Sequence, residues 1–260
     1  MKIHQTIEAD LADSVMTVRL NRPDKHNAFD ETMLREVTDC FRNLPEEVLC
    51  VVLRGNGKSF CAGVDLNWMK EVAKNSYEKN YRESLLLSEC FYSIYTCLRP
   101  TIAVVHGVSL GGANGLLAAC DIAYAAEDAV FSLSEVKIGI IPACISPYII
   151  KLIGEYPSRE LMLTGRRISG KEAEKYHLVN KAVPADGLDQ ELGSLIASLR
   201  TSGPRALGHV RKLIFDITNN LTLDEAYDQT ARMIADIRAS EEGQEGMAAF
   251  LEKRKPNWIK

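Results

Sequence analysis

The sequence has 260 residues, 46% of them apolar and 25% charged, so it can bury a substantial core. Its net charge of −4 offers no general attraction to a polyanion, which disfavours nucleic-acid binding. The seven cysteines are scattered and include no CxxC pair, which argues against disulfides or zinc and favours a reducing compartment. No apolar run approaches the ~20 residues of a membrane span, and the N-terminus lacks a signal-peptide core, so a cytoplasmic location is expected.

The first half of the chain alternates between predicted strands and helices. Residues 13–20 alternate in polarity, with Met16, Val18 and Leu20 on one face, as in a half-buried strand. Asp30 is predicted to cap a helix, because the apolar residues that follow it fall at helical spacing. Further strands are predicted at 48–53, 101–106, 121–125 and 130–133, with helices at 78–98 and 113–119.

From residue 146 the pattern becomes helical. Helices are predicted at 146–153, 158–163, 170–176, 187–200, 203–218, 222–239 and 241–254. Strands followed by gathered helices predict an α/β core, residues 1–200, and a C-terminal helical region, residues 201–260. Apolar residues such as Val210 and Ile214 recur along that region, so it must pack on the core or on another subunit.

Two glycine-containing loops are candidates for binding a ligand through the backbone. Each joins a buried strand to a helix through small residues, Ala62 to Asp65 in one and Leu110 to Ala113 in the other. The second opens a helix, whose free N–H groups favour a developing negative charge. Two converging N–H groups would form an oxyanion hole. Glycines are common at such joints, so the spacing alone also fits two ordinary tight connections.

Five segments, taken in order, carry a resemblance to a known family. They are residues 21–28 (Asn-Arg-Pro-Asp-Lys-His-Asn-Ala), 60–66 (Phe-Cys-Ala-Gly-Val-Asp-Leu), 107–113 (Gly-Val-Ser-Leu-Gly-Gly-Ala), 120–123 (Cys-Asp-Ile-Ala) and 134–142 (Ser-Glu-Val-Lys-Ile-Gly-Ile-Ile-Pro). Together they resemble the crotonase, or enoyl-CoA hydratase/isomerase, superfamily over essentially the whole chain. The resemblance implies an α/β spiral of ββα repeats with a C-terminal helical trimerisation region, assembled as a homotrimer or a dimer of trimers.

The resemblance also implies a set of site residues. The backbone N–H groups of Val64 and Gly112 match the donors that hold the thioester carbonyl, and Glu135 matches a catalytic carboxylate aimed at the acyl group. The implied substrate-binding residues are Lys25, Ala62, Asp65, Leu66, Trp68, Phe250 and Lys253. Phe250 and Lys253 would reach the coenzyme A of a neighbouring subunit. No metal and no separate cofactor are expected, because coenzyme A is part of the acyl-CoA substrate.

Glu135 is the expected acid and base. A carboxyl group in that position must move a proton, so burial should raise its pKa toward neutrality. Taken as an isolated residue, a glutamate is expected on the surface.

The sequence departs from the family at one position. Two-carboxylate hydratases carry a further glutamate three residues after the second donor, where this chain has Gly115, with Asn114 beside it as a residue that could orient water. A single carboxylate suffices to move a double bond from the 3,4 to the 2,3 position, which makes an enoyl-CoA isomerase the main alternative. If only the missing partner limits hydration, a Gly115→Glu substitution should raise crotonyl-CoA hydration.

Finer likenesses favour the hydratase. Residues 65–69, 111–117, 134–142 and 145–148 are similar to bacterial methylglutaconyl-CoA hydratases of leucine and isoprenoid breakdown, which also tend to have glycine at the position of Gly115. Their substrate has a distal carboxylate, and Lys70, Lys74 or Arg82 could bind it. Decarboxylation is a further alternative. A non-enzymatic RNA-binding or scaffold role is disfavoured, because both loops and Glu135 are intact and the chain is acidic.

Overall fold

The computed structural model describes residues 4–72 and 74–259. The chain divides into two compact units. The first holds the residues up to Cys97 together with Thr101–Leu192, and the second holds Leu98–Pro100 together with the residues from Gly193 onward. The division falls within helix α8 (Leu188–Arg200), a few residues before the boundary expected at 200.

A six-stranded sheet forms the centre of the first unit. Its strand order is β1-β2-β3-β4-β6-β9, in which β1 and β2 are antiparallel and all the later neighbours are parallel. The strands are β1 (Ile7–Ala12), β2 (Val15–Leu20), β3 (Cys50–Gly55), β4 (Thr101–Val105), β6 (Ile122–Ala126) and β9 (Lys181–Val183). A smaller sheet contains β5 (Val108–Leu110), β7 (Val130–Ser132) and β8 (Ile168–Ser169).

Burial explains which segments became strands. Met16, Val18 and Leu20 of β2 are buried while the residues between them are partly exposed, as the alternating pattern predicted. All five residues of β4 are buried, as expected for a parallel strand covered on both faces. Parallel strands need crossover connections, and helices supply them here.

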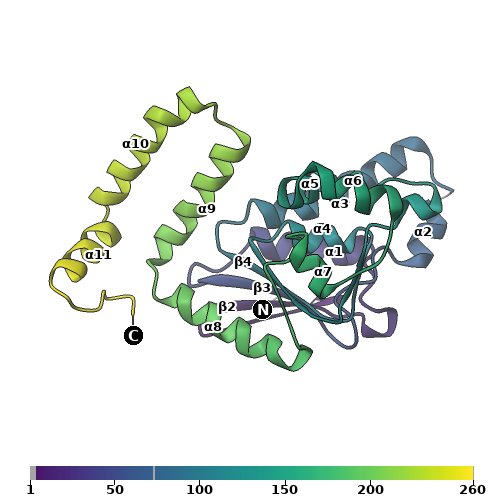
Figure 1. Ribbon diagram of the computed structural model, residues 1–260, viewed down its shortest axis with the longest axis horizontal. Coiled ribbons are helices and arrows are strands. Elements are labelled where there is room, and N and C mark those ends of the chain that lie inside the picture. The colour runs from purple at the N-terminus through teal and green to yellow at the C-terminus, as the bar shows by residue number, and fades with distance from the viewer. Residues whose placement is uncertain (1–3, 73, 260) are drawn as a thin grey trace. The chain divides into compact units, whose positions relative to one another are not determined.

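Helices α1 (Glu31–Arg42), α3 (Tyr77–Tyr95) and α4 (Ala113–Ala118) lie on one face of the central sheet (Figure 1). Asp30 caps α1 as predicted, because its side chain accepts a hydrogen bond from the N–H of Met33 at 3.0 Å. The buried face of α1 packs against α3, and α3 contacts α4. The first unit also contains α2 (Leu66–Val72), α5 (Ser146–Ile153), α6 (Glu155–Thr164) and α7 (Gly170–Lys175).

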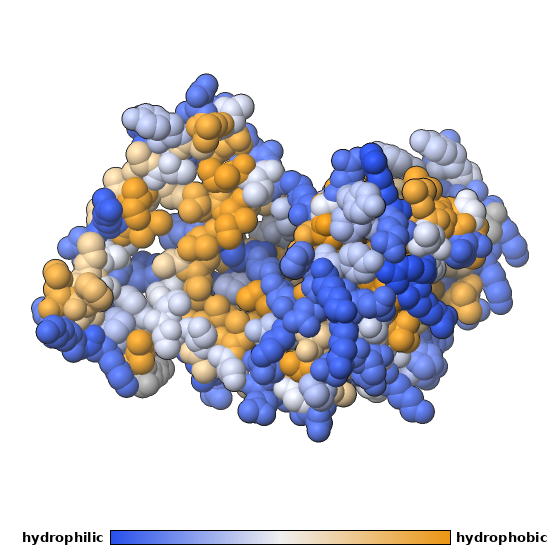
Figure 2. Space-filling model, in the orientation of Figure 1, coloured by the Kyte–Doolittle hydropathy of each residue, from blue (hydrophilic) through white to orange (hydrophobic). Residues whose placement is uncertain are grey.

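The second unit is helical within its described residues, with α9 (Pro204–Asn219), α10 (Leu223–Ala239) and α11 (Glu241–Leu251). A reciprocal capping box between Thr222 and Glu225 starts α10. Apolar side chains gather along α9 and α10 in the space-filling view (Figure 2). No helix among residues 4–72 and 74–259 is long and apolar enough to cross a membrane.

Candidate active site

Strand β5 brings the two glycine-containing turns together. The N–H of Cys61 donates to the carbonyl of Val108 at 3.0 Å, and the N–H of Leu110 donates to the carbonyl of Cys61 at 3.2 Å. The turns that follow are in close contact, because a Cβ added to Gly63 would lie 2.6 Å from the carbonyl oxygen of Leu110. Two turns that are distant in the sequence are therefore packed against each other, one just before the amide of Val64 and the other just before that of Gly112.

The amide of Val64 is oriented by the peptide unit to which it belongs. Gly63 has a φ of 91°, and its carbonyl accepts a hydrogen bond from the N–H of Phe29 at 2.8 Å. In a trans peptide the carbonyl and the following N–H point in opposite directions, so the Val64 N–H points away from Phe29. Within the described part of the chain, the Val64 N–H donates no hydrogen bond.

The same geometry fixes the amide of Gly112. The carbonyl of Gly111 accepts hydrogen bonds from the backbone N–H of Asn114 at 3.0 Å and from its Nδ2 at 2.9 Å. The N–H of Gly112 therefore points the opposite way, and it too has no acceptor among residues 4–72 and 74–259. Asn114 is fully buried and its Nδ2 also donates to the carbonyl of Ser132. It holds this turn in place, so the expectation that it orients a water molecule is wrong.

Glu135 lies beside these two amides. It begins a short 3-10 turn that follows β7, and its Oε1 would lie 3.3 Å from a Cβ added to Gly111. Its Oε2 is buried and has no hydrogen-bond partner among the described residues. Burial raises the pKa of the Glu135 carboxyl above its ordinary value of 4.5, because the ionised form loses water without gaining a positive partner. This is the direction predicted from the sequence.

A cavity of about 530 Å³ contains both amide-bearing residues and the carboxylate. Val64, Gly112 and Glu135 line it, and so do Trp68 and Met69 of α2. From the sequence, those two side chains fitted either an acyl pocket or ordinary packing. The rest of the wall comes mainly from α3 and from the loop between Glu135 and α5, with Phe29 from before α1 and Val72 from the end of α2. This further lining comprises Phe29, Val72, Asn80, Glu83, Ser84, Leu87, Phe91, Gly139, Ile140, Ile141, Pro142, Ala143, Cys144 and Ile145.

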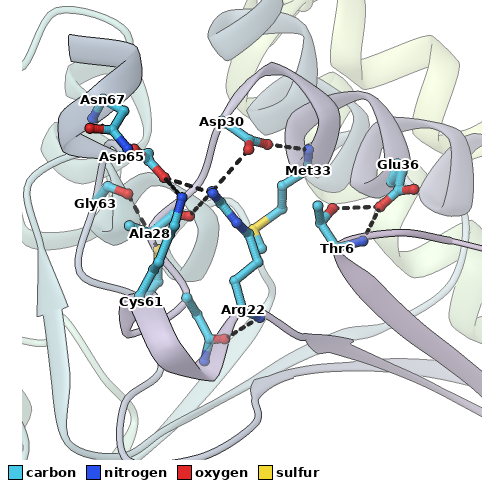
Figure 3. Close-up of polar contacts among 12 residues, drawn as sticks. Thr6, Arg22, Ala28, Asp30, Met33, Glu36, Cys61, Gly63, Asp65 and Asn67 are labelled. Atoms are coloured by element: carbon cyan, nitrogen blue, oxygen red, sulfur yellow. Dashed lines mark hydrogen bonds and ion pairs between the residues drawn. The ribbon is translucent and has the colours of Figure 1, made fainter. Parts of the chain in front are cut away.

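A buried ion-pair cluster supports the first turn (Figure 3). Arg22 reaches Asp65 Oδ2 at 2.7 Å and Asp30 Oδ2 at 3.0 Å, and it donates to the carbonyl of Ala28 at 2.6 Å. Lys25 Nζ lies 3.0 Å from the same oxygen of Asp65. Burial alone would raise the pKa of Asp65, but hydrogen bonds from Lys25, the N–H of Asn67 and Arg22 outweigh it and lower that pKa to about 2. Asp65 therefore stays ionised, and its bond to the Asn67 N–H caps the start of α2.

We expect Arg22→Ala to destabilise the protein strongly. The Arg22 and Asp65 side chains are only 13% and 6% exposed, so the substitution leaves a buried carboxylate with Lys25 as its remaining positively charged partner. Loss of one member of a buried pair costs about 3 kcal/mol or more. Urea unfolding of the variant measures this change in the free energy of unfolding.

Arg35→Ala is the matched control. Arg35 pairs with Glu31 on the surface of α1, with side chains 64% and 49% exposed, so its loss should cost well under about 1 kcal/mol. Equal losses in the two variants would show that the Arg22 cluster does not stabilise this turn.

The other predicted binding residues divide into two groups. Lys25, Ala62, Asp65 and Leu66 lie on or beside the first turn but do not line the cavity, and Leu66 is 71% exposed. Their contact with the nucleotide end of coenzyme A stays a prediction. Phe250 and Lys253 belong to the second unit, where Phe250 is 83% exposed, and their expected role across subunits also stays a prediction.

Apolar side chains fill the space beside Gly115. A Cβ added there would lie 2.5 Å from Ile145 Cγ2 and 2.9 Å from Phe91 Cζ. The position where related hydratases carry their other glutamate is therefore closed, and a larger side chain cannot enter without displacing the Phe91 ring. Among the residues that the structure describes, Glu135 is the one carboxylate beside the two amides.

Sequence reasoning missed the part of the cavity wall formed by α3. Asn80, Glu83, Ser84, Leu87 and Phe91 follow one another at helical spacing and face the cavity together. The helical spacing was present in the sequence, but three of the five residues are polar, which is typical of an exposed helix face, and their place in the wall depends on the loop that packs against them.

Two backbone amides without acceptors and a carboxyl with one buried, unpaired oxygen share one cavity, an arrangement suited to stabilising negative charge on a carbonyl oxygen. Residues 10–260 match the family model described as Enoyl-CoA hydratase/isomerase. A solved enoyl-CoA hydratase from Shewanella pealeana superposes with a TM-score of 0.92 at 38% identity, covering 98% of this chain and 96% of that one.

Curated relatives carry names of both reaction types. Enoyl-CoA hydratase ACTT6 of Alternaria alternata is 34% identical over 90% of this chain and 78% of its own length. The mitochondrial Delta(3,5)-Delta(2,4)-dienoyl-CoA isomerase of Dictyostelium discoideum is 30% identical over 96% of this chain and 89% of its own. The chain therefore belongs to the enoyl-CoA hydratase/isomerase family.

Proposed function

We propose that this enzyme adds water across the 2,3-double bond of an enoyl-CoA thioester, with Glu135 as the acid and base. The observation that carries the proposal is the buried, unpartnered Oε2 of Glu135 in the same cavity as the free amides of Val64 and Gly112. The two amides would hold the thioester oxygen, and coenzyme A would enter as part of the substrate, so the reaction needs no separate cofactor.

The proposed step balances with one carboxylate. Ionised Glu135 takes a proton from a water molecule as the water oxygen bonds to the β-carbon. The electrons of the double bond move to the thioester oxygen, where the two amides stabilise the enolate. The enolate collapses as Glu135 returns the proton to the α-carbon, which regenerates the carboxylate.

Isomerisation is the second candidate, and the closed space beside Gly115 favours it. Glu135 would remove an α-proton from a 3-enoyl-CoA, and the amides would stabilise the resulting dienolate. Return of the proton to the γ-carbon places the double bond at the 2,3 position. This reaction needs no ordered water and no further carboxylate, which fits a position filled by Phe91 and Ile145.

For the acyl group, the lining favours an uncharged chain. The cavity walls include Glu83 and Glu135, whereas no lysine or arginine of the described chain lines them. Lys70, Lys74 and Arg82 are exposed and lie outside the lining, so none of them is positioned there for a distal carboxylate. 3-Methylglutaconyl-CoA, suggested by the sequence resemblance, is therefore the comparison substrate in the test.

Incubation in D₂O with crotonyl-, 3-hexenoyl- and 3-methylglutaconyl-CoA, read by mass spectrometry, tests these reactions. Hydration gives a product that has gained D₂O, whereas isomerisation shifts the alkene of the 3-enoyl substrate without adding water. We expect gain of D₂O with crotonyl-CoA. A shifted alkene with no hydration of any substrate would overturn the hydratase proposal and support the isomerase. No reaction with any substrate would refute both proposals.

We also propose that the enzyme is a homotrimer or a dimer of trimers. Helices α9 and α10 expose Val210, Ile214, Ile217 and Ile234, each at least 42% accessible, and apolar surface of this kind is buried in stable assemblies. Light scattering should give a mass three or six times that of one chain. A monomeric mass at micromolar concentration would contradict the proposal.

A further inference from the structure

Helix α3 forms a wall of the cavity that changes character along its length. Phe91 lies beside Gly115 in α4, near the reacting end, where a Cβ on Gly115 would meet its ring at 2.9 Å. Asn80 lies eleven residues earlier on the same face, which is about 16 Å along a helix axis. Leu87 and Phe91 are apolar, whereas Asn80, Glu83 and Ser84 make the opposite end polar.

Asn80 presents an unused acceptor at that polar end. Its Oδ1 is buried, lacks a hydrogen-bond partner among the described residues and belongs to a side chain that lines the cavity. Only two buried side-chain atoms of the described chain are in this state, and the other is the Oε2 of Glu135. A buried acceptor without a partner carries a desolvation cost, which a bound hydrogen-bond donor removes.

Glu83 adds a second acceptor one turn further along. Its side chain is 13% exposed, and the Nδ2 of Asn75 lies 3.2 Å from each of its carboxylate oxygens. Lys79 is 3.9 Å from Glu83 Oε1 but does not line the cavity. The hydroxyl of Ser84 is directed into the helix, where it donates to the carbonyl of Asn80 at 2.9 Å.

We propose that Asn80 and Glu83 form a subsite for the far end of the acyl chain, selecting an uncharged hydrogen-bond donor such as a terminal hydroxyl. Both residues offer acceptors, which favours a donor. Glu83 is acidic and no cation of the described chain lines the cavity, which disfavours a terminal carboxylate. The subsite rests on the proposed enoyl-CoA function and specifies the substrate class for it.

The experiment compares three thioesters of equal length, trans-2-decenoyl-CoA and its counterparts with a terminal hydroxyl or a terminal carboxylate. We expect wild-type kcat/KM for the hydroxyl substrate to exceed that for the methyl-terminated one about tenfold, the effect of satisfying a buried acceptor. The carboxylate substrate should be the poorest. Crotonyl-CoA, which has no chain to reach Asn80, reports the basic reaction separately.

Variants assign the preference to residues. Asn80→Leu should abolish or reverse the ratio of hydroxyl to methyl substrates, and Glu83→Gln should raise the ratio of carboxylate to methyl substrates. Arg82→Gln is the matched control on the same helix, because its exposed side chain lies outside the lining and the ratios should not change.

The outcomes separate the subsite from the proposed function. Turnover of crotonyl-CoA with no preference between hydroxyl and methyl ends, or with a preference for the carboxylate, overturns the subsite alone. No turnover of any of these thioesters overturns the enoyl-CoA function on which the subsite rests. The wild-type comparison decides the matter even if Asn80→Leu fails to fold.

Discussion

Glu135→Gln should lower kcat/KM by about 10²–10⁴-fold, the usual contribution of a positioned acid and base. Glutamine has nearly the same shape and leaves the amides of Val64 and Gly112 in place, so thioester binding should change little. Steady-state kinetics with crotonyl-CoA and a binding measurement with a non-reactive acyl-CoA separate the two effects. Retention of more than about a tenth of the wild-type rate would assign the proton transfer to another residue.

Glu127→Gln serves as the control for loss of a carboxylate. Glu127 pairs with Lys171 at 2.7 Å near the surface and does not line the cavity, so its substitution should leave the rate unchanged.

The dependence of kcat/KM on pH gives an independent test of Glu135. Glu135 must be ionised to accept a proton, and burial raises its pKa, so wild-type kcat/KM should fall with decreasing pH at a midpoint above 4.5. The residual activity of Glu135→Gln should lack that fall.

Gly115→Glu should destabilise the enzyme by about 3 kcal/mol or more and should not raise hydration. The new Cβ would overlap Ile145 and the Phe91 ring, and overpacking of this kind costs about 1–3 kcal/mol before the carboxylate is considered. The carboxylate would then be held among apolar groups, which adds a desolvation cost. Urea unfolding and a crotonyl-CoA hydration assay measure the two outcomes. From the sequence, faster hydration is expected only if the missing glutamate alone limits the reaction, and the packing beside Gly115 adds a further obstacle.

Gly193→Glu is the control for this substitution. Gly193 lies in α8, is exposed and has no atom within 4 Å of an added Cβ, so glutamate there should be neutral or slightly stabilising. The double variant Gly115→Glu/Phe91→Ala should recover part of the lost stability, because it opens the space that the new side chain needs. A stable single variant with faster hydration would show that the Phe91 ring moves aside easily.

Local pattern was sufficient to predict the long elements of the fold. The alternation in β2, the cap of α1 at Asp30 and the bounds of α5 all follow from neighbouring residues, and the structure confirms them. β1 was missed because charged residues alternate through it at the sheet edge, where they remain solvated. The strands β5, β8 and β9 have only two or three residues each, too few for a period to be recognised.

The site was predictable where it depends on the backbone and unpredictable where distant side chains meet. Val64, Gly112 and Glu135 were assigned by motif, and the structure places all three in one cavity, while their catalytic roles stay a prediction. The role of Asn114 and the closed space at Gly115 depend on Ser132, Phe91 and Ile145, which reach them from other elements. No spacing within residues 111–117 carries that information.

The main-chain hydrogen bonds at Gly63 and Gly111 have a consequence for how such an enzyme can change its chemistry. The N–H groups of Val64 and Gly112 are oriented by hydrogen bonds to the carbonyls that precede them. Gly63 accepts from the N–H of Phe29, and Gly111 accepts from both the N–H and the side-chain Nδ2 of Asn114. Under the proposed function, replacing Glu135 would therefore leave both donors to the thioester oxygen in place. Related enzymes with the same backbone could therefore differ in their proton-transfer reaction through one or two side chains. The backbone geometry that would bind the thioester oxygen would stay the same.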